Sequence, residues 1–243
     1  MKFFFLIPVY NEADNIELLS NNLKNCIESK QERCYIFVDD CSSDNSIELI
    51  KQYFEGYDYH IITKQVNGGP GDSFNKGFEY IIQQSSSAED IVITLEADNT
   101  SDLNILKDMT EISKLGYDLV LASVYAQGGG FEKTSTFRKL FSTLANLVIR
   151  FIFNIKILTL SSFYRIYKVS FLKKIKEKYN IIIEERGFIS MVEILIKSIC
   201  LNAKIIEVPM VLCSDKRVGK SKMKVFKTMI SYLKFLLKKK QIK

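Results

Sequence analysis

The sequence has few of the residues that most often serve acid–base and zinc chemistry. Its single histidine, His60, lies in an apolar run with the pattern of a strand, so we do not expect a histidine general base. The five cysteines are scattered without a Cys-x-x-Cys pair, which is typical of a reduced, intracellular protein and argues against a zinc site. The glycine-rich stretch lacks the Lys-Ser/Thr of a P-loop, so ATP hydrolysis is not supported.

Long apolar runs are also absent. The first residues lack the basic start, longer apolar stretch and cleavage site of a signal peptide, so we expect none. Residues 137–157 and 222–240 are apolar but interrupted by lysine and arginine, so neither predicts a membrane-spanning helix. Both fit amphipathic helices that lie on an anionic membrane surface, or that pack on the domain or on a second subunit. We therefore expect a cytoplasmic protein held peripherally on the inner face of the cell membrane, with a membrane protein or a second copy of the chain as a candidate partner.

The charge is unevenly divided along the chain. The 243 residues are 47% hydrophobic and 26% charged, which predicts a globular domain with a buried core. Residues 1–130 hold 9 Lys and Arg against 21 Asp and Glu, whereas residues 131–243 hold 25 against 7. An acidic first part suits a bound cation, and a basic second part suits a phosphate or a lipid surface. Nucleic acid is not an expected partner, because the lysines lack an interleaved aromatic platform.

Short apolar runs alternate with helical patterns through residue 122. The runs predict buried strands at Phe3–Ile7, Tyr35–Val38, Tyr59–Ile62, Ile91–Leu95 and Leu119–Ala122. The helical patterns fall at Ile16–Ile27, Ile47–Phe54, Phe74–Ile82 and Leu103–Leu115. Asp44 and Asp102 stand where helix N-caps are expected. This alternation predicts an α/β fold with a mainly parallel central sheet flanked by helices, which binds ligands outside the carboxyl ends of its strands.

Three polar clusters follow the predicted strands. Residues 8–12 (Pro-Val-Tyr-Asn-Glu) follow the first strand, and residues 39–44 (Asp-Asp-Cys-Ser-Ser-Asp) follow the second. Asp39 and Asp40 can accept hydrogen bonds from a base or a ribose, although turn and cap roles explain such residues equally well. Residues 67–71 (Asn-Gly-Gly-Pro-Gly) precede a predicted helix, and their small size would let backbone N–H groups approach a phosphate.

The fourth cluster, residues 94–100 (Thr-Leu-Glu-Ala-Asp-Asn-Thr), is the most informative. Residues two apart on a strand point to the same side, so we expect Glu96 and Asp98 to converge while Ala97 turns away. Two carboxylates at a strand end offer hard oxygen ligands to Mg²⁺ or Mn²⁺. Such a cation would neutralise a diphosphate leaving group. The alternative is a pair of solvated acids.

Together these clusters resemble the nucleotide-sugar-binding half of the family 2 glycosyltransferases, which have the GT-A fold. Further segments follow in the order found in the polyprenyl-phosphate glycosyltransferases of the dolichol-phosphate mannose synthase type. These segments are Phe137–Lys139, Arg165–Tyr167, Glu193, Glu207–Pro209 and Arg217–Met223. The resemblance implies one GT-A domain over residues 1–222, with a nucleotide-sugar half at 1–125 and an acceptor half at 126–222. A basic amphipathic helix would follow at 223–243.

The resemblance also implies roles for individual residues. The nucleotide sugar would contact Pro8, Tyr10, Glu12, Asp39, Asp40, Gly69, Glu96, Ala97 and Asp98. Mg²⁺ or Mn²⁺ would bind Glu96 and Asp98, with Thr100 as a third ligand. Catalysis would rest on Asp98, Arg217 and Lys222. The positive charges of Arg217 and Lys222 would stabilise the departing diphosphate. Arg138 and Ser221 would meet the acceptor phosphate.

The implied reaction moves a sugar from a UDP- or GDP-sugar to a polyprenyl phosphate, by in-line displacement with inversion. A phosphate acceptor needs no general base, whereas a hydroxyl acceptor would need a carboxylate, for which Glu193 and Asp98 are the candidates. The chain has Val124 where the family often has arginine and Thr159 where it has an acidic residue. These differences concern the acceptor side, and they leave a hydroxyl of a surface glycan as an alternative acceptor. Glu96 replaces a family aspartate, and a non-catalytic nucleotide-sugar-binding homologue is a further alternative.

Overall fold

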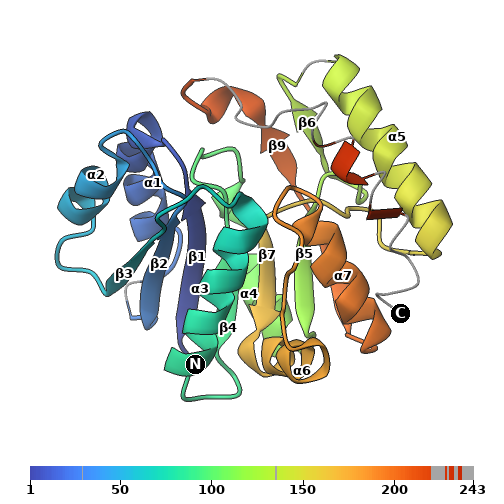
Figure 1. Cartoon of the computed structure of the whole chain (residues 1–243), viewed down its shortest axis with the longest axis horizontal. Helices are drawn as coiled ribbons and strands as arrows, with labels where there is room; N and C mark the ends of the chain where they lie inside the picture. The colour runs from blue at the N-terminus through green and yellow to red at the C-terminus, as the bar shows by residue number, and fades with distance from the viewer. Residues whose placement is uncertain (29, 135, 220–227, 229, 233–234, 237–243) are drawn as a thin grey trace.

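The computed structural model describes residues 1–28, 30–134, 136–219, 228, 230–232 and 235–236. Its centre is a seven-stranded sheet with the order β3-β2-β1-β4-β7-β5-β8 (Figure 1). Only β7 runs antiparallel to its neighbours in this sheet. The strands are β1 (Phe3–Val9), β2 (Arg33–Asp39), β3 (Tyr59–Thr63), β4 (Ile91–Thr94), β5 (Leu119–Ser123), β7 (Arg165–Lys168) and β8 (Ile205–Pro209). The expected α/β fold with a mainly parallel sheet is therefore confirmed.

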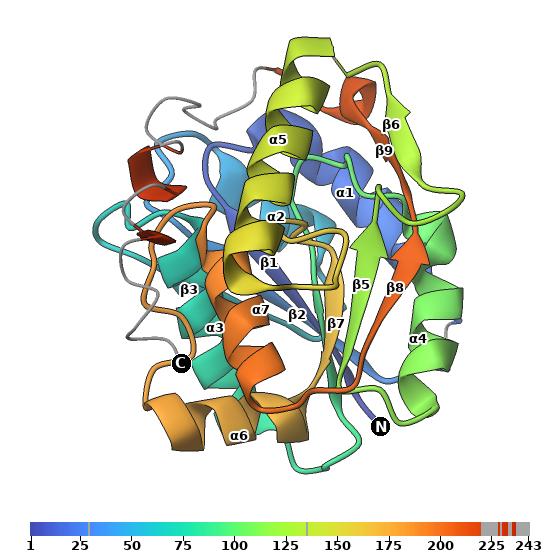
Figure 2. The same cartoon turned by 90° about the vertical axis from the view of Figure 1, so that its right-hand side faces the viewer.

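Helices cover both faces of the sheet (Figures 1 and 2). One face carries α1, α2 and α4, and the other carries α3, α6 and α7. The helices are α1 (Ala13–Asn25), α2 (Ser46–Tyr53), α3 (Pro70–Gln84), α4 (Leu106–Lys114), α5 (Thr136–Phe153), α6 (Val169–Tyr179) and α7 (Ser190–Cys200), with short 3₁₀ turns η1 (Leu103–Ile105) and η2 (Ser214–Lys216). Above the carboxyl edge of the sheet, α5 lies beside a small ladder formed by β6 (Gly130–Glu132) and β9 (Val211–Cys213).

The strands are apolar on both sides because helices bury both faces. In β1, Phe3 and Phe5 belong to the core under α1, α2 and α4, whereas Phe4 and Leu6 belong to the core under α3, α6 and α7. This alternation follows from the two-residue period of a strand. The run of apolar residues that predicted a buried strand is thus explained by two cores rather than one.

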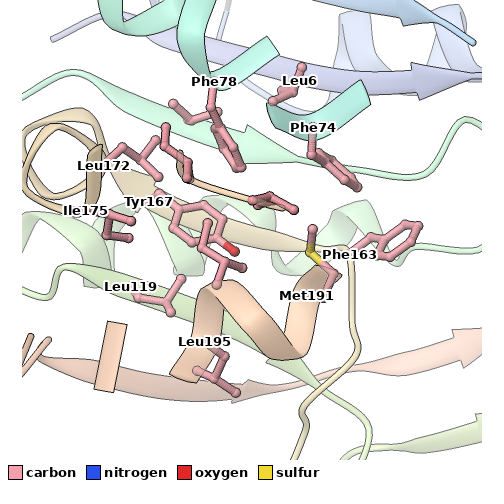
Figure 3. Close-up of a cluster of buried hydrophobic side chains, with 14 of the residues drawn as sticks. Leu6, Phe74, Phe78, Leu119, Phe163, Tyr167, Leu172, Ile175, Met191 and Leu195 are labelled. Carbon is pink, nitrogen blue, oxygen red and sulfur yellow. The ribbon is translucent and has the colours of Figure 1, made fainter. Parts of the chain in front are cut away.

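The core on the α3 side depends on a close approach between that helix and β1. Phe74 and Phe78 of α3 point toward the sheet in Figure 3, and the ring of Phe78 lies 5.4 Å from that of Tyr167 in β7. A Cβ at Gly77 would lie 2.1 Å from Cδ1 of Leu6. A methyl group at position 77 would therefore overlap with the side chain of Leu6 unless Leu6 moved.

The expected elements are present, although most of their ends differ by a few residues. The strand expected to include Leu95 ends at Thr94. Asp102 accepts a hydrogen bond from the Asn104 N–H at 3.1 Å and caps η1, as expected. Asp44 is not the cap residue of α2, which is Asn45. The Asp44 carboxylate instead accepts N–H groups of Ala13 and Ser46, so it joins the first turns of α1 and α2.

The order of the strands changes direction at β1. The chain moves from β1 outward to β2 and β3, and then returns to place β4 on the other side of β1. The loops that follow β1 and β4 therefore diverge and leave a crevice between them. Ligands of open α/β sheets bind at such a switch point.

One face of α5 packs on the domain. Ile149 and Phe153 are buried, and the ring of Phe235 lies 5.9 Å from that of Phe153. The amphipathic helix expected at 223–243 lies mostly outside the described residues, but the buried Phe235 favours the alternative in which its apolar side packs on the domain. Within the described part of the chain, no helix is long and apolar enough to cross a bilayer.

We expect Gly77→Ala to destabilise the fold, because the added methyl group would collide with Leu6. The free energy of unfolding in urea should fall by about 1–3 kcal/mol, the usual cost of overpacking a core. The control is Gly130→Ala, where a Cβ meets no atom within 4 Å and the expected change is less than about 0.5 kcal/mol. Equal effects of the two substitutions would contradict the close packing of α3 on β1.

Candidate functional site

A cleft of about 1560 Å³ lies at the carboxyl edge of the sheet, at the switch point beside β1. The expected site residues that line it are Pro8, Tyr10, Glu12, Asp40, Gly69, Glu96, Ala97, Asp98, Thr100 and Arg217. Its far wall is more apolar, with Leu144 and Val148 of α5 and with Leu236. Asp39 is buried, and its carboxylate accepts the N–H of Ser42.

The acidic pair after β4 lies in a turn rather than on a strand. Because β4 ends at Thr94, the strand period that predicted convergence does not apply. Glu96 and Asp98 nevertheless come together, because both carboxylates approach the Thr100 hydroxyl. Its oxygen lies 2.7 Å from Asp98 Oδ1 and 3.4 Å from Glu96 Oε2. Ala97 is buried in the core on the α1 side and also lines the cleft.

Arg217 reaches this turn from the other half of the chain. Its Nε lies 2.6 Å from Asp98 Oδ2, and its second guanidinium nitrogen contacts the same oxygen. Two oxygens of Asp98 thus have different partners, the Thr100 hydroxyl and the Arg217 guanidinium. The geometry places the Arg217 guanidinium at Asp98 and brings together four residues of the expected site, Glu96, Asp98, Thr100 and Arg217.

The oxygen atoms of this turn fit a hard divalent cation. Two carboxylates and one hydroxyl are the donor types that Mg²⁺ and Mn²⁺ prefer. The described residues contain no group of three or more His, Cys, Asp or Glu side chains that could enclose a metal ion. Protein sites for Mg²⁺ usually supply one or two carboxylates, and substrate phosphates and water complete the coordination.

The glycine loop at 67–71 does not form the expected cradle for a phosphate. The N–H groups of Gly68 and Gly69 donate to the Asp40 carboxylate at 2.7 and 2.8 Å. The N–H of Gly71 donates to the Arg186 carbonyl at 2.8 Å. These backbone donors already have partners within the protein, so the prediction of a backbone phosphate site was wrong.

The glycines instead allow another loop to pack on the start of α3. Gly69 has a φ of 82°, and a Cβ there would lie 2.6 Å from the Arg186 carbonyl oxygen. A Cβ at Gly71 would lie 1.9 Å from the carbonyl oxygen of Glu185. Gly69 remains part of the cleft wall, which keeps its predicted contact with the nucleotide sugar open.

Asp40 has a structural role in the same region. Its carboxylate is buried and lies 2.6 Å from Nζ of Lys64, which also pairs with Asp72 at 2.5 Å. Together with the two glycine N–H groups, this ion pair accounts for the charge of Asp40. The Asp40 side chain therefore holds the glycine loop. Its contacts with Lys64 and the two glycine N–H groups do not favour the predicted contact with a base or ribose.

Glu193 does not stand where a general base would be needed. It is 2% exposed, lies 2.7 Å from Nζ of Lys197, and accepts the N–H groups of Glu184 and Glu185. Lys197 donates in turn to the Ile181 carbonyl at 3.0 Å. The buried pair thus anchors the loop at 184–188, and the expectation of Glu193 as a base for a hydroxyl acceptor was wrong.

The loop at 184–188 contains residues that the sequence did not single out. Arg186 lines the cleft beside the glycine loop, and Phe188 stacks on Phe163 with ring centroids 5.4 Å apart. A lone arginine between Glu185 and Gly187 has no recognisable spacing, so no signal could have found it. Buried Asn15 in the first turn of α1 was missed too, although a polar residue beside the apolar stripe of that helix is a detectable signal.

The neutral side chains of Thr159 and Tyr232 line the cleft near β5, where Thr159 is held by the buried Ser123 and by Glu207 behind it. The hydroxyls of Ser123 and Thr159 lie 2.7 Å apart, and the N–H of Thr159 donates to Glu207 at 2.8 Å. Tyr232 lines the same wall, and burial raises the pKa of its hydroxyl to about 12, so it stays protonated near neutral pH. The wall can therefore donate and accept hydrogen bonds without adding charge.

Three of the expected residues are not placed. Arg138 lies on α5, but its side chain is outside what the structure describes, as are residues Ser221 and Lys222. Their expected roles toward the acceptor phosphate and the leaving group remain predictions. Arg186 and Arg217 are the arginines that line the cleft among the described residues.

Solved structures show the same fold. The chain superposes on Staphylococcus aureus TarS bound to UDP-GlcNAc with a TM-score of 0.60 and 24% identity, over 90% of this chain and 60% of that one. It superposes on glucosyl-3-phosphoglycerate synthase from Mycobacterium tuberculosis, solved with Mn²⁺, UDP and glucosyl-3-phosphoglycerate, with a TM-score of 0.64 and 13% identity. That match covers 96% of this chain and 76% of the synthase. The GT-A fold is therefore confirmed.

Sequence relatives extend the likeness over the whole chain. A dolichol-phosphate mannosyltransferase of Pyrococcus furiosus is 28% identical over 97% of this chain, which spans 63% of that protein. An undecaprenyl-phosphate mannosyltransferase of Micrococcus luteus is 25% identical over 92% of this chain and 88% of its own length. The model of glycosyl transferase family 2 matches residues 4–176. With this match and the acidic turn at the switch point, the chain belongs to glycosyl transferase family 2.

Proposed function

We propose that this protein transfers a sugar from a UDP- or GDP-sugar to a polyprenyl phosphate at a membrane surface, with the help of a divalent cation. The observation that carries the proposal is the convergence of Glu96, Asp98 and Thr100 at the switch point, with Arg217 beside them. Relatives that are named for transfer to dolichol phosphate or undecaprenyl phosphate supply the acceptor class.

Glu96 and Asp98 are the residues that would hold Mg²⁺ or Mn²⁺, with Thr100 next to them. A bound cation would supply charge for the diphosphate of the donor and stabilise it as a leaving group. Arg217 adds a second positive charge at the same place, and such preorganised charge is the main source of catalysis in group transfer. Pro8, Tyr10 and Glu12 line the adjacent part of the cleft, where the nucleoside would bind.

The proposed reaction is a single displacement at the anomeric carbon. An oxygen of the acceptor phosphate forms the new bond on one face, while the bond to the diphosphate oxygen breaks on the other. The electron pair of the broken bond stays with the diphosphate, and the configuration inverts. The acceptor oxygen is anionic near neutral pH, so no proton has to be removed. This agrees with the buried, ion-paired state of Glu193.

The test is nucleotide release from a panel of UDP- and GDP-sugars with Mn²⁺ or Mg²⁺, with and without a short polyprenyl phosphate. We expect release that requires the lipid phosphate and the metal. Asp98→Asn should lower the rate by about 100-fold or more, because it weakens the cation site and the contact with Arg217. Asp108→Asn, an exposed aspartate of α4, is the control and should leave the rate unchanged.

Donor binding without lipid-dependent release would overturn the lipid acceptor. The neutral hydroxyl of Thr159 in the cleft wall makes a glycan hydroxyl the second candidate acceptor, and release that depends on a sugar acceptor would establish it. Binding with no release in any mixture would indicate a non-catalytic homologue.

Glu193→Gln separates an anchoring role from a catalytic one. The substitution leaves Lys197 as a buried charge without its partner, so the free energy of unfolding should fall by about 3–5 kcal/mol. Below the new unfolding transition, turnover should stay within a few-fold of wild type. Glu177→Gln, at an exposed position of α6, should change neither quantity. Loss of turnover with unchanged stability would restore Glu193 as a base.

The outer face of α5 supports attachment to a membrane. Leu140, Leu144, Leu147 and Phe151 follow a helical spacing and are 57–87% exposed. The helix contains no acidic residue, and Lys139 and Arg150 lie along it. An apolar stripe with basic flanks is the pattern of a helix in the plane of an anionic bilayer. Leu144 also lines the cleft, so the stripe would bring the cleft to the lipid.

We expect Leu147→Ser combined with Phe151→Ser to weaken binding to vesicles of phosphatidylglycerol and phosphatidylcholine. The loss should be about tenfold or more in co-sedimentation, because two large apolar side chains leave the bilayer. Higher salt should weaken the binding of the wild type. Leu115→Ser is the control, since Leu115 at the end of α4 is 77% exposed but lies outside the stripe. Equal losses in both variants would disprove docking through α5.

A further inference from the structure

A short strap carries Arg217 to the cleft. It comprises residues 214–219, beginning with η2 directly after β9. Its first residues are tied to the end of the β6 ladder, where Lys133 pairs with Asp215 at 2.5 Å and the hydroxyls of Thr134 and Ser214 lie 2.5 Å apart. Arg217 itself reaches Asp98. The strap therefore joins the acceptor half of the chain to the nucleotide half.

The far end of the strap is held by Asn15. This side chain is 2% exposed in the first turn of α1. Its Oδ1 accepts the N–H of Val218 at 3.0 Å, and its Nδ2 donates to the Val218 carbonyl at 3.2 Å. The carboxamide thus pairs with both polar groups of one backbone residue, as a neighbouring strand would. This double contact spans 203 positions of sequence.

Asn15 also contacts the loop after β1 and the acidic turn after β4. Its Nδ2 donates to Glu12 Oε2 at 2.7 Å, and its backbone carbonyl accepts from Nδ2 of Asn99 at 3.0 Å. Glu12 lies after β1, and Asn99 belongs to the turn that carries Glu96 and Asp98. One buried residue therefore connects the loop after β1, the acidic turn and the strap.

These contacts differ from those of a residue that only stabilises the helix. In a capping box, the side chain at this third helical position returns to the backbone N–H of the cap residue. Oδ1 of Asn15 is used by the strap, and the cap residue Glu12 shows no side-chain capping bond. Only a carboxamide can both donate and accept in this geometry. Aspartate has the same shape but cannot donate, and it would place a negative charge beside Glu12.

We propose that Asn15 is the positioning residue for Arg217: it docks the strap so that the guanidinium stands over the reaction centre. This inference rests on the proposed function for its catalytic consequence, but not for the docking itself. Because Asn15 holds the backbone of Val218, Arg217 can exchange Asp98 for the donor diphosphate while the strap stays in place. The catalytic contribution of Arg217 then depends on Asn15.

The kinetic test combines Asn15→Asp with Arg217→Ala. Asn15→Asp alone should lower kcat by about 10- to 100-fold, the range in which misplacement of a catalytic group falls. Any change in the KM for the donor that comes from the lost contact with Glu12 should be the same with and without Arg217, so the test compares kcat. In the Arg217→Ala background the same substitution should cost less than about twofold, since coupled residues are not additive. Equal losses in both backgrounds would overturn the proposal.

Two further variants guard against a folding defect. Asn21→Asp changes an exposed asparagine of the same helix and should leave kcat unchanged. Val218→Pro removes the N–H that Asn15 accepts, at a position that is 52% exposed and outside the core. It should reproduce the loss of Asn15→Asp, and the double variant should be no slower than either single one. A double variant that is slower by the product of both losses would contradict a shared contact.

A measurement without turnover separates this inference from the proposed function. Trypsin cuts after lysine and arginine, and the strap contains Lys216 and Arg217. Fragments ending at these residues should form at least about fivefold faster in Asn15→Asp than in wild type or Asn21→Asp, because undocked backbone is the preferred protease substrate. That result would hold even if no sugar transfer were found. Equal cleavage rates in all three proteins would show that Asn15 does not dock the strap.

Discussion

The site depends on the reversal of strand order beside β1. Because β2 and β4 flank this strand, the loops that follow β1 and β4 open away from each other. The crevice between them receives the acidic turn from one side and the β1–α1 connection from the other. Every further contact of the site, including the arrival of Arg217 at Asp98, uses the space that this topology leaves open.

Buried charges hold the loops around that space. Asp40 and Lys64 secure the glycine loop, and Glu193 and Lys197 secure the loop at 184–188. In both cases, the carboxylate is shared between an ammonium group and two backbone N–H groups, which compensates for the loss of water around it. Asp40 and Glu193 are acidic residues that suggest chemistry by their type, but they serve as anchors. The carboxylates of the turn after β4 line the cleft instead.

The two halves of the chain contribute different kinds of group. The first half brings the acidic turn and the cleft wall after β1, whereas the second brings Arg217, Arg186 and the apolar face of α5. The strap joins them through Asn15, so the acidic turn and Arg217 meet only when the halves are assembled. A divided site of this kind suits the proposed reaction, in which one cleft would hold a charged donor and a lipid-linked acceptor.

The sequence by itself determined the fold class, the approximate positions of the first five strands, and the acidic cluster that follows the fourth of them. Local periodicity and the order of polar clusters carry this information, because strand alternation and loop chemistry are properties of adjacent residues. Only the tertiary structure decided which polar groups were free for chemistry. Glu193 and Asp40 became anchors and the glycine N–H groups found partners inside the protein, because each pairing joins segments far apart in the chain. The contact between Asn15 and Val218 could not be predicted for the same reason, since two residues 203 positions apart leave no local pattern in the sequence.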